Sequence, residues 1–355
     1  MPSQMRVEIA EQPDALRRTL DSLLPQAGAL EALGRETRQV LFIARGSSDN
    51  AAVYGQYLCS VRAGRLASLA SPSLATVYRA DLDLQGVLAV AVSQSGATEE
   101  IVTTLQWARR RGARTVAVTN VPGSPLTEAA DVALITQAGR ELAVPATKTY
   151  TTQLAALAVL ALSLGRAADG PAGEGGPGAG LEGLQGVPDA VEAMLDVAPA
   201  AEALAGRLTG ADTLVVSGRG FAYSTALELS LKLKETCYVT AVGLSYADLV
   251  HGPIAILDPG TPALLVAAAD GPMLPEMTGL ARRIAATGAD VYGIGGGQEL
   301  AAVCRSTLPG PGLPEHLAPL ALVVPGQLLV EALARAKGLD PDAPRGLDKV
   351  TQTDP

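Results

Sequence analysis

The chain has 355 residues, a length that suggests two domains. Hydrophobic residues make up 48% of the chain but aromatic residues only 3%, so the cores must be built mainly from Ala, Leu and Val. The formal net charge of -9, without a basic stripe, argues against a nucleic-acid-binding protein. Cys59, Cys237 and Cys304 lie in apolar segments without CxxC spacing, which indicates core residues in a reducing compartment rather than metal ligands or disulfides.

The N-terminal region and the apolar runs give no sign of export or membrane insertion. Glu8, Glu11 and Asp14 interrupt the N-terminal region, which has no apolar core of the kind found in signal peptides. The longest apolar run, residues 154–164, is shorter than the roughly 20 residues that a helix needs to span a bilayer. We therefore expect a cytoplasmic protein that has no membrane partner.

The first half of the chain alternates predicted helices and strands. Residues 4–34 have a helical pattern that breaks at Pro25, and a helix at residues 147–164 closes the unit. This alternation predicts a doubly wound parallel sheet, in which ligands bind beyond the carboxyl ends of the strands, where the strand order reverses. The buried strands are predicted at residues 40–44, 66–69, 87–92, 114–119 and 132–136.

Two loops rich in hydroxyl groups follow predicted strands. One is Arg-Gly-Ser-Ser at residues 45–48, and the other is Ser-Gln-Ser-Gly-Ala-Thr at residues 93–98, which leads into a helical pattern. Backbone N–H groups at a helix start, together with Ser and Thr hydroxyls, can hold a phosphate. The alternative is that these residues only cap helices, but a cap usually uses one such residue. The second loop has three hydroxyls and a glutamine, so the pattern favours a phosphate site.

The second half repeats the first in outline, after a Gly/Pro-rich stretch at residues 165–188 that predicts a flexible linker. A helix capped at Asp189 and running to Leu208 is expected, and a Gly-Arg-Gly loop at residues 218–220 opens another helix. The loop at residues 268–272 contains Asp270 and no Ser or Thr, so the second domain is expected to bind no phosphate of its own. Strands are predicted at residues 213–217, 239–242, 262–267, 290–294 and 319–324, which indicates an internal duplication.

The chain has two histidines. His251 precedes a Gly-Pro turn that would fix its backbone and aim its ring, which suits an acid–base group near neutral pH. A lone histidine is more often structural than catalytic. His316 lies in a Pro/Gly-rich stretch and is expected to be solvated.

A polar helix and the tail are the remaining candidates. Glu228, Lys232 and Glu235 share one face of a predicted helix. The pattern alone favours a salt-bridged solvent face over a carboxylate base with a lysine beside it. The tail, residues 341–349, has too few apolar residues for a helix or strand and by itself would be predicted to be disordered.

Together these stretches resemble the sugar isomerase (SIS) domain family over nearly the whole chain. More closely, they are similar to the isomerase half of the glutamine–fructose-6-phosphate aminotransferases. Each motif alone is weak, but their joint order is specific. The motifs are Glu-Ile-Ala-Glu-Gln-Pro at 8–13, Gly-Ser-Ser at 46–48, Ser-Gln-Ser-Gly-Ala-Thr at 93–98, Ala-Thr-Lys-Thr-Tyr-Thr-Thr-Gln at 146–153, Ala-Leu-Glu at 226–228, Lys-Leu-Lys-Glu at 232–235, His-Gly-Pro at 251–253 and the tail from Pro344-Arg345 to Lys349.

The resemblance implies a fold and a domain layout. The fold class would be α/β, with two tandem SIS domains, each a doubly wound five-stranded parallel sheet with helices on both faces. The expected parts are an N-terminal helical arm at 1–36, a first SIS domain that binds phosphate at 37–165, a linker at 166–188, a second SIS domain at 189–336 and a C-terminal tail over the active site at 337–355.

The resemblance also implies roles for single residues. Glu235 would be the base that moves a proton between C1 and C2. His251 would open the sugar ring from the partner subunit of a homodimer, and Lys349 would cover the site and could form a Schiff base with the open-chain ketose. No metal or cofactor is implied. The phosphate of a hexose 6-phosphate or amino-hexose 6-phosphate would be held by Ser48, Ser93, Gln94, Ser95 and Thr98, and the sugar by Gly46, Ala146, Glu228 and Lys232.

Departures from the aminotransferase pattern narrow the expected reaction. No cysteine precedes Cys59, so we do not expect glutamine-dependent ammonia release. Val250 stands where the aminotransferases have lysine, and the tail Arg-Gly-Leu-Asp-Lys-Val-Thr resembles the stand-alone deaminases and fructosamine-phosphate deglycases of the family. The leading expectation is the conversion of glucosamine 6-phosphate to fructose 6-phosphate and ammonia, or the reverse, ammonia-dependent reaction.

Three alternatives stay open. Two are enzymes, a fructosamine-6-phosphate deglycase and a galactosamine-6-phosphate deaminase. The third, of another class, is a non-catalytic sugar-phosphate sensor. The joint presence of Glu235, His251 and Lys349 argues against a sensor.

Overall fold

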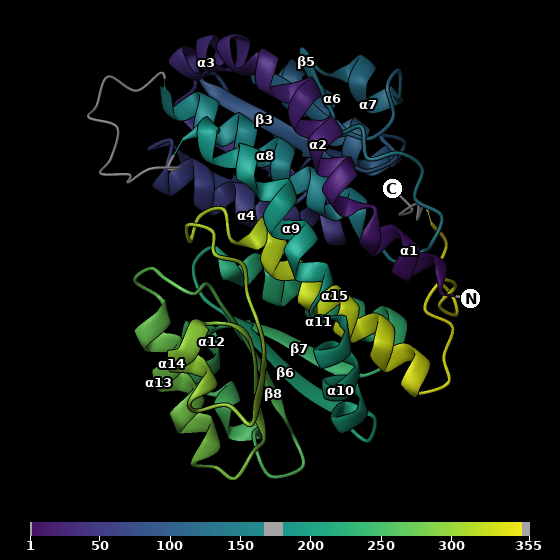
Figure 1. Ribbon diagram of the computed structural model, residues 1–355. Coiled ribbons are helices and arrows are strands. Elements are labelled where there is room, and N and C mark those ends of the chain that lie inside the picture. Colours follow the sequence, from purple (N-terminus) through teal and green to yellow (C-terminus); the bar gives the residue numbers. More distant parts are fainter. Residues whose placement is uncertain (1, 167–179, 350–355) are drawn as a thin grey trace. The chain divides into compact units, whose positions relative to one another are not determined.

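The computed structural model describes residues 2–166 and 180–349 (Figure 1). The chain forms two compact units, each assembled from segments that are distant in the sequence. The first-sheet unit contains residues 14–141, 148–185 and 348–355. The second-sheet unit contains residues 1–13, 142–147 and 186–347.

The first-sheet unit is built on a five-stranded parallel sheet of order β2-β1-β3-β4-β5. The order reverses between β1 and β3, where Val40 lies beside Leu88 in the register. The predicted strands are confirmed to within one residue at each end. Their bounds are β1 (Gln39–Ile43), β2 (Leu66–Leu69), β3 (Val87–Val92), β4 (Arg114–Thr119) and β5 (Val132–Ile135).

Helices cover both faces of this sheet. On one face α4 packs on β1 and β2, and the buried helix α8 packs on α4 and α3. On the other face α6 packs on β3 and contacts α5 and α7. The bounds are α2 (Gln12–Leu23), η1 (Leu24–Gln26), α3 (Ala27–Glu36), α4 (Ser47–Val61), α5 (Ser73–Thr76), α6 (Glu99–Arg110), α7 (Pro125–Ala129) and α8 (Lys148–Arg166).

The second-sheet unit repeats this topology in a parallel sheet of order β10-β9-β8-β6-β7. Counted from its own first strand, the order is the same as in the first sheet, which confirms the predicted α/β duplication. The bounds are β6 (Thr213–Gly218), β7 (Thr240–Ser245), β8 (Ala263–Ala267), β9 (Val291–Gly295) and β10 (Ser306–Leu308).

Helices cover both faces of the second sheet as well (Figure 1). On one face α11 packs on β6 and β7, and α15 packs on α11. On the other face α12 packs on β7 and α13 on β8. The bounds are α1 (Gln4–Ala10), η2 (Leu181–Gly186), α9 (Val187–Leu195), α10 (Ala198–Leu208), α11 (Ala222–Cys237), α12 (Tyr246–Val250), η3 (Pro253–Ile256), α13 (Leu274–Ala285), α14 (Gly297–Ala301) and α15 (Pro319–Ala336).

The predicted strand at residues 319–324 is wrong, because these residues begin α15 and the fifth strand is β10. A short apolar run does not distinguish a buried strand from a buried helix, and here the run is the start of an 18-residue helix. By length and composition α15 could cross a membrane, but 89% of it is buried inside the protein. It is therefore a core helix of its unit.

Two other predictions for the start of the second half need correction. The helix expected from Asp189 to Leu208 is two helices, α9 and α10, because Pro199 is accommodated in the first turn of a new helix. The cap of α9 is Gly186 rather than Asp189. Residues 181–188, at the end of the predicted linker, form η2 and the start of α9, whereas residues 167–179 of that linker lie outside the described part of the chain.

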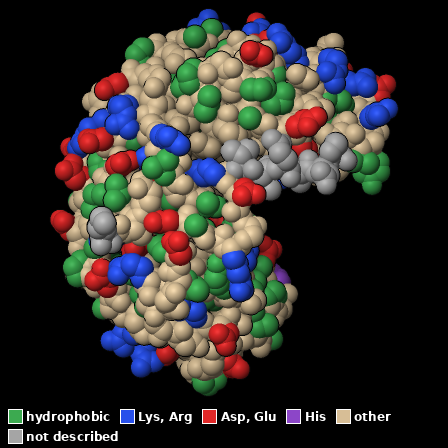
Figure 2. All heavy atoms as spheres, turned by 90° about the vertical axis from the view of Figure 1, so that its right-hand side faces the viewer, with side chains coloured by type: hydrophobic (Ala, Val, Ile, Leu, Met, Phe, Trp, Pro, Cys, Tyr) green, Lys and Arg blue, Asp and Glu red, His purple; other side chains and the backbone are tan. Residues whose placement is uncertain are grey.

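The surface and the thiols agree with the composition. On the face drawn in Figure 2, Lys and Arg side chains are interspersed with Asp and Glu, and no continuous basic surface appears.

Cys59 and Cys237 are buried and Cys304 is partly buried, and all three are free. Burial raises the pKa of the Cys59 and Cys237 thiols to about 12, so they behave as core residues.

Candidate active site

The two hydroxyl-rich loops lie at the carboxyl ends of β1 and β3, the strands between which the order of the first sheet reverses. The first loop leads into α4, whose N-cap is Gly46 with a φ of 59°. The second loop leads into α6, whose N-cap is Thr98. Because parallel neighbours end at the same edge, the positive ends of α4 and α6 meet there, as an anion site requires.

The loop at residues 93–98 is fixed by bonds to the loop after β4. The backbone N–H of Asn120 donates to the carbonyl of Gln94 (3.1 Å), and that of Leu126 donates to the carbonyl of Gly96 (3.0 Å). Gly96 has a φ of +61°, and a Cβ at this position would lie 2.2 Å from Ser124 Oγ, so glycine alone fits. The protein therefore sets the shape of this loop in advance, which lowers the entropic cost of binding an anion.

Hydroxyl groups in these loops are available to a ligand. Neither the side chain of Ser48 nor that of Thr98 forms a hydrogen bond with any residue in the described part of the chain. Ser95 is partly exposed, and its hydroxyl accepts the N–H of Ala97 (3.2 Å). Ser93 is buried beneath the loop and accepts the N–H of Gly96 (3.3 Å).

One ion pair joins the loop after β1 to the start of α6. Arg45, in the loop after β1, makes a bidentate contact with Glu100 in the first turn of α6, with both N–O distances 3.1 Å. Burial raises the pKa of nearby Asp49, and Arg45 opposes that shift. Since the guanidinium already faces a carboxylate, a phosphate at this edge would depend on N–H groups and hydroxyls.

A buried polar cluster lies on α11 in the second-sheet unit. Lys232 is 1% exposed and forms an ion pair with Glu235, and its Nζ lies 3.7 Å from Oε1 of Glu228, which is fully buried. The side chain of Glu235 is 23% exposed. The solvent-face interpretation is therefore wrong, because Glu228 and Lys232 are buried in the folded chain. The cluster thus places a lysine between two carboxylates, of which only Glu235 is partly exposed.

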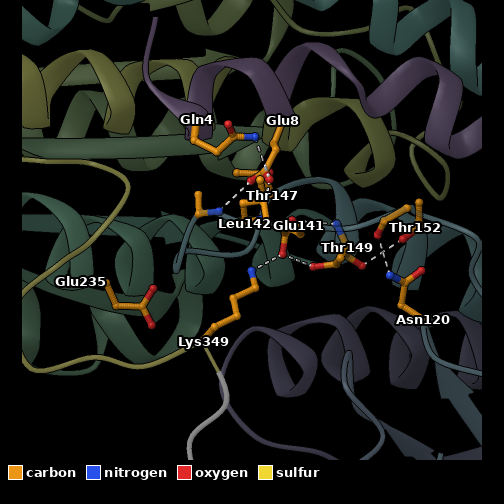
Figure 3. Close-up of polar contacts among 12 residues, drawn as sticks. Gln4, Glu8, Asn120, Glu141, Leu142, Thr147, Thr149, Thr152, Glu235 and Lys349 are labelled. Carbon is orange, nitrogen blue, oxygen red and sulfur yellow. Dashed lines mark hydrogen bonds and ion pairs between the residues drawn. The ribbon is translucent and has the colours of Figure 1, made fainter.

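The tail lysine lies in the first-sheet unit against a buried carboxylate that sequence reasoning missed. Lys349 Nζ contacts Glu141 Oε2 at 2.5 Å, as Figure 3 shows. Glu141 also accepts the hydroxyl of Thr149 (2.6 Å) and its backbone N–H (3.1 Å). The signal available in the sequence was the position of Glu141 just ahead of the motif at 146–153. These contacts fix the lysine by a charge-assisted network.

The tail before Lys349 is ordered by the second-sheet unit without forming a helix or strand. The Asp342 carboxylate accepts the backbone N–H groups of Gln4 and Met5, both at 2.7 Å, at the N-terminus of α1. The Arg345 N–H donates to the Tyr238 hydroxyl at 2.8 Å, and the guanidinium lies 4.3 Å from the centre of that ring. The prediction of disorder for residues 341–349 in isolation fails because distant segments supply these partners.

The two histidines differ from each other in burial. His251 follows α12 and is exposed, ahead of Gly252 with a φ of 134°. His316, which we expected to be solvated, is only 7% exposed, with its ring 6.4 Å from that of Phe221. The Pro/Gly-rich stretch around His316 misled the prediction, because it packs onto the start of α11 instead of lying in solvent.

The equivalent edge of the second sheet is acidic. A Cβ on Gly271 would lie 2.5 Å from Glu315 Oε2, so this carboxylate packs against the loop after β8. Burial, and then the charge of Asp270, raise the pKa of Glu315 to about 6. Glu315 thus places a second carboxylate beside the loop that contains Asp270, and two carboxylates at this position disfavour phosphate binding.

The predicted site residues fall on both units. Within the described ranges 2–166 and 180–349, no cluster of His, Cys, Asp and Glu has an arrangement suited to a metal ion. The first-sheet unit contains Gly46, Ser48, Ser93, Gln94, Ser95, Thr98 and Lys349. The second-sheet unit contains Ala146, Glu228, Lys232, Glu235 and His251.

A family model described as SIS domain matches residues 35–163 and 207–331. The chain belongs to the SIS domain family. The two matched segments contain the two sheets, so the repeat in the sequence is a repeat of this domain. The family is one of sugar-isomerase-type enzymes.

Relatives of this chain carry the name glutamine--fructose-6-phosphate aminotransferase [isomerizing]. That of Thermococcus kodakarensis is 36% identical over 351 residues, which cover 98% of this chain and 58% of the relative. That of Symbiobacterium thermophilum is 39% identical over 360 residues, covering 97% of this chain and 58% of the relative. The chain therefore spans a little more than half the length of these relatives.

Solved structures agree with this family. A phosphosugar isomerase of Silicibacter pomeroyi, described as putative, has a TM-score of 0.85 at 34% identity, covering 96% of this chain and 100% of that chain. The C-terminal domain of the glucosamine-fructose-6-phosphate aminotransferase of Francisella tularensis has a TM-score of 0.86 at 27% identity, and the match covers 97% of this chain and 99% of that chain. A glucosamine-6-phosphate deaminase of Thermotoga maritima, with a TM-score of 0.80 at 23% identity, shares the fold.

Proposed function

We propose that the chain converts glucosamine 6-phosphate and water to fructose 6-phosphate and ammonia, or catalyses the reverse reaction. The observation that carries this proposal is the polar cluster on α11. Two of its members, Glu228 and Lys232, are buried, and Glu235 is the carboxylate that remains 23% exposed. A base for an aldose–ketose rearrangement must reach a carbon-bound proton, and Glu235 is the partly exposed carboxylate of this cluster, held in place by its ion pair with Lys232.

The phosphate of the substrate is assigned to the loops after β1 and β3. Ser48, Ser93, Gln94, Ser95 and Thr98 supply hydroxyl and amide groups at the start of α4 and α6. Holding the phosphate contributes positioning rather than chemistry, because it limits the motion of the reacting end of the sugar. The sugar part of the substrate would be contacted by Gly46, Ala146, Glu228 and Lys232.

The reaction itself is assigned to three groups. His251 opens the sugar ring, and Glu235 moves the proton from C2 to C1, which turns the 2-amino-aldose into a 2-imino-ketose. Water then adds to the C=N carbon and ammonia leaves, which gives the ketose. Lys349, held by Glu141, covers the site and can form a Schiff base with the open-chain ketose.

Two further statements belong to the proposal. The protein acts as a homodimer in which His251 is donated to the site of the partner subunit, and the exposed position of His251 after α12 supports this role. We also infer that it works in the cytoplasm, in line with its free cysteines.

The test is ammonia release from a panel of purified sugar phosphates. Glucosamine 6-phosphate should release ammonia and give fructose 6-phosphate in equal amounts. Galactosamine 6-phosphate and a fructosamine 6-phosphate that carries an amino acid serve as competing substrates. If either of these turns over faster than glucosamine 6-phosphate, it is the preferred substrate and the proposed reaction is wrong. If the protein binds hexose phosphates tightly but turns none of them over, it is a sugar-phosphate sensor and not an enzyme.

A further inference from the structure

A basic cleft in the first-sheet unit lies away from the two phosphate-binding loops. It has a volume of about 510 Å³, which suits a small molecule. Residues of α5 and the segment after it form one wall, and the last turns of α6 form the other. Its polar lining consists of Thr76, Arg79, Thr103, Arg110 and Arg111, beside the indole of Trp107.

The position of the cleft separates it from the proposed sugar site. The phosphate-binding loop precedes the first turn of α6, whereas Arg110 is the last residue of that helix. At 1.5 Å per residue, the two ends of this 12-residue helix are roughly 16 Å apart. A ligand in the cleft therefore contacts neither Ser93 nor Thr98.

Two of the three guanidinium groups have no acidic partner. Arg111 forms an ion pair with Asp81, so its charge is already compensated. Arg79 and Arg110 are exposed and form no ion pair with any residue in the described ranges. The cleft therefore carries two positive charges without an ion-pair partner, next to the side chains of Thr76 and Thr103.

The backbone at Arg79 is strained. Its φ of 50° is in the left-handed region, which disfavours residues other than glycine, asparagine and aspartate. The neighbouring backbone is fixed: the Ala80 N–H donates to the carbonyl of Leu74 (2.8 Å), and the Trp107 indole N–H donates to the carbonyl of Ala80 (3.0 Å). Strain of this kind persists where the surrounding structure imposes it, and it often marks a binding site.

We propose that this cleft binds a small anion that carries two linked phosphate groups. Guanidinium forks match phosphate oxygens in bidentate geometry, and two separate forks suit two phosphates better than one. The Thr103 hydroxyl can donate a further hydrogen bond, whereas that of Thr76 already donates to the carbonyl of Pro72 (3.2 Å). The volume accommodates a diphosphate together with an attached group. The proposal does not depend on the reaction assigned to the chain.

The test is calorimetric titration of the purified protein with inorganic pyrophosphate, and with ADP, at physiological ionic strength. Replacement of both uncompensated arginines, Arg79→Asn with Arg110→Gln, should weaken pyrophosphate binding by at least about tenfold. Asparagine tolerates the left-handed backbone, so the unfolding temperature should not fall. ADP should compete with pyrophosphate, and tighter binding of ADP would assign part of the cleft to the nucleoside.

Arg109→Gln is the matched control, because Arg109 lies on the same helix but pairs with Asp131 at 2.8 Å and does not line the cleft. Its affinity for pyrophosphate should equal that of the parent protein. If Arg109→Gln loses as much affinity for pyrophosphate as the double variant, the binding reflects the overall positive charge of this surface and not a specific site, and the proposal is wrong. The same affinity in the double variant and the parent, or no saturable binding by the parent, would also overturn the proposal.

Discussion

At the residue scale, the polar groups in the loops could be predicted, but their partners could not. Serines and threonines after buried strands point to the carboxyl edge of a parallel sheet by position alone. Glu141, in contrast, becomes a candidate only when its contacts with Thr149 and Lys349 are known, because the tail and the loop are more than 200 residues apart in the sequence. The burial of Glu228 and Lys232 also could not be predicted, because their spacing on the helix is equally typical of a solvent-exposed face.

Glu315 provides a prediction at this scale. The group has a pKa raised to about 6 by burial and by Asp270, so ionisation is less favourable in the folded protein than in the unfolded chain. Its contribution to stability is full below pH 4.5 and is lost as the pH rises through 6. Glu315→Gln should therefore raise the free energy of unfolding by about 1 kcal/mol at pH 8, after allowance for partial exposure, and have little effect at pH 4.

The check is urea unfolding of this variant at both pH values. Glu299→Gln, an exposed carboxylate on α14, serves as the control and should change stability at neither pH. A Glu315→Gln variant that is stabilised equally at pH 4 and pH 8 would contradict the assignment.

At the scale of the elements, the strands that end in a distinct loop were predictable, whereas the apolar start of α15 was not. Strand β3 was predicted with its observed bounds because a glycine and hydroxyl residues follow it directly. The start of α15 was mistaken for a strand because six apolar residues in a row carry no period. Only the length of the whole segment, 18 residues up to Ala336, indicates a helix.

The loop between β3 and α6 provides a prediction at this scale. Gly96→Ala would place a Cβ 2.2 Å from Ser124 Oγ in a residue with a φ of +61°. We expect a loss of about 2–4 kcal/mol in the free energy of unfolding, from backbone strain and the steric clash together. Denaturant unfolding measures this loss.

Gly123→Ala separates the two causes. Gly123 has a φ of +68°, but nothing lies within 4 Å of the position that a Cβ would occupy, so this variant should lose only about 1 kcal/mol from backbone strain. If the two variants lose equal stability, the close packing of Gly96 against the loop after β4 does not restrain the phosphate-binding loop.

At the scale of the whole molecule, the duplication was readable from the sequence, but the assembly of the units was not. The two sheets share one strand order, and only the first has hydroxyl-rich loops where that order reverses. Each unit also takes in segments from the other half of the chain, such as residues 1–13 and 348–355. No local pattern signals such an exchange, because it depends on long-range contacts.

The proposed homodimer yields a prediction for mixed subunits. Glu235→Gln and His251→Asn should each be inactive alone. If His251 serves the site of the partner subunit, a dimer with one subunit of each kind has one intact site. Random exchange of equal amounts should then restore about a quarter of the parent activity, because half of the dimers are mixed and each has one active site of two.

The measurement is ammonia release after the two variants are unfolded and refolded together, compared with each variant refolded alone. Activity that stays at the level of the single variants would mean that His251 acts within its own subunit. A single-subunit mass in sedimentation experiments would exclude the exchange altogether.

The central claim, that Glu235 moves the proton in an amino-sugar phosphate, is tested most directly by ammonia release from glucosamine 6-phosphate by Glu235→Gln. The variant should bind fructose 6-phosphate like the parent but release ammonia about a thousandfold more slowly. Glu202→Gln, which removes a surface carboxylate paired with Arg335, should keep the parent rate. An unchanged rate in Glu235→Gln, or no ammonia from the parent protein, would contradict the account.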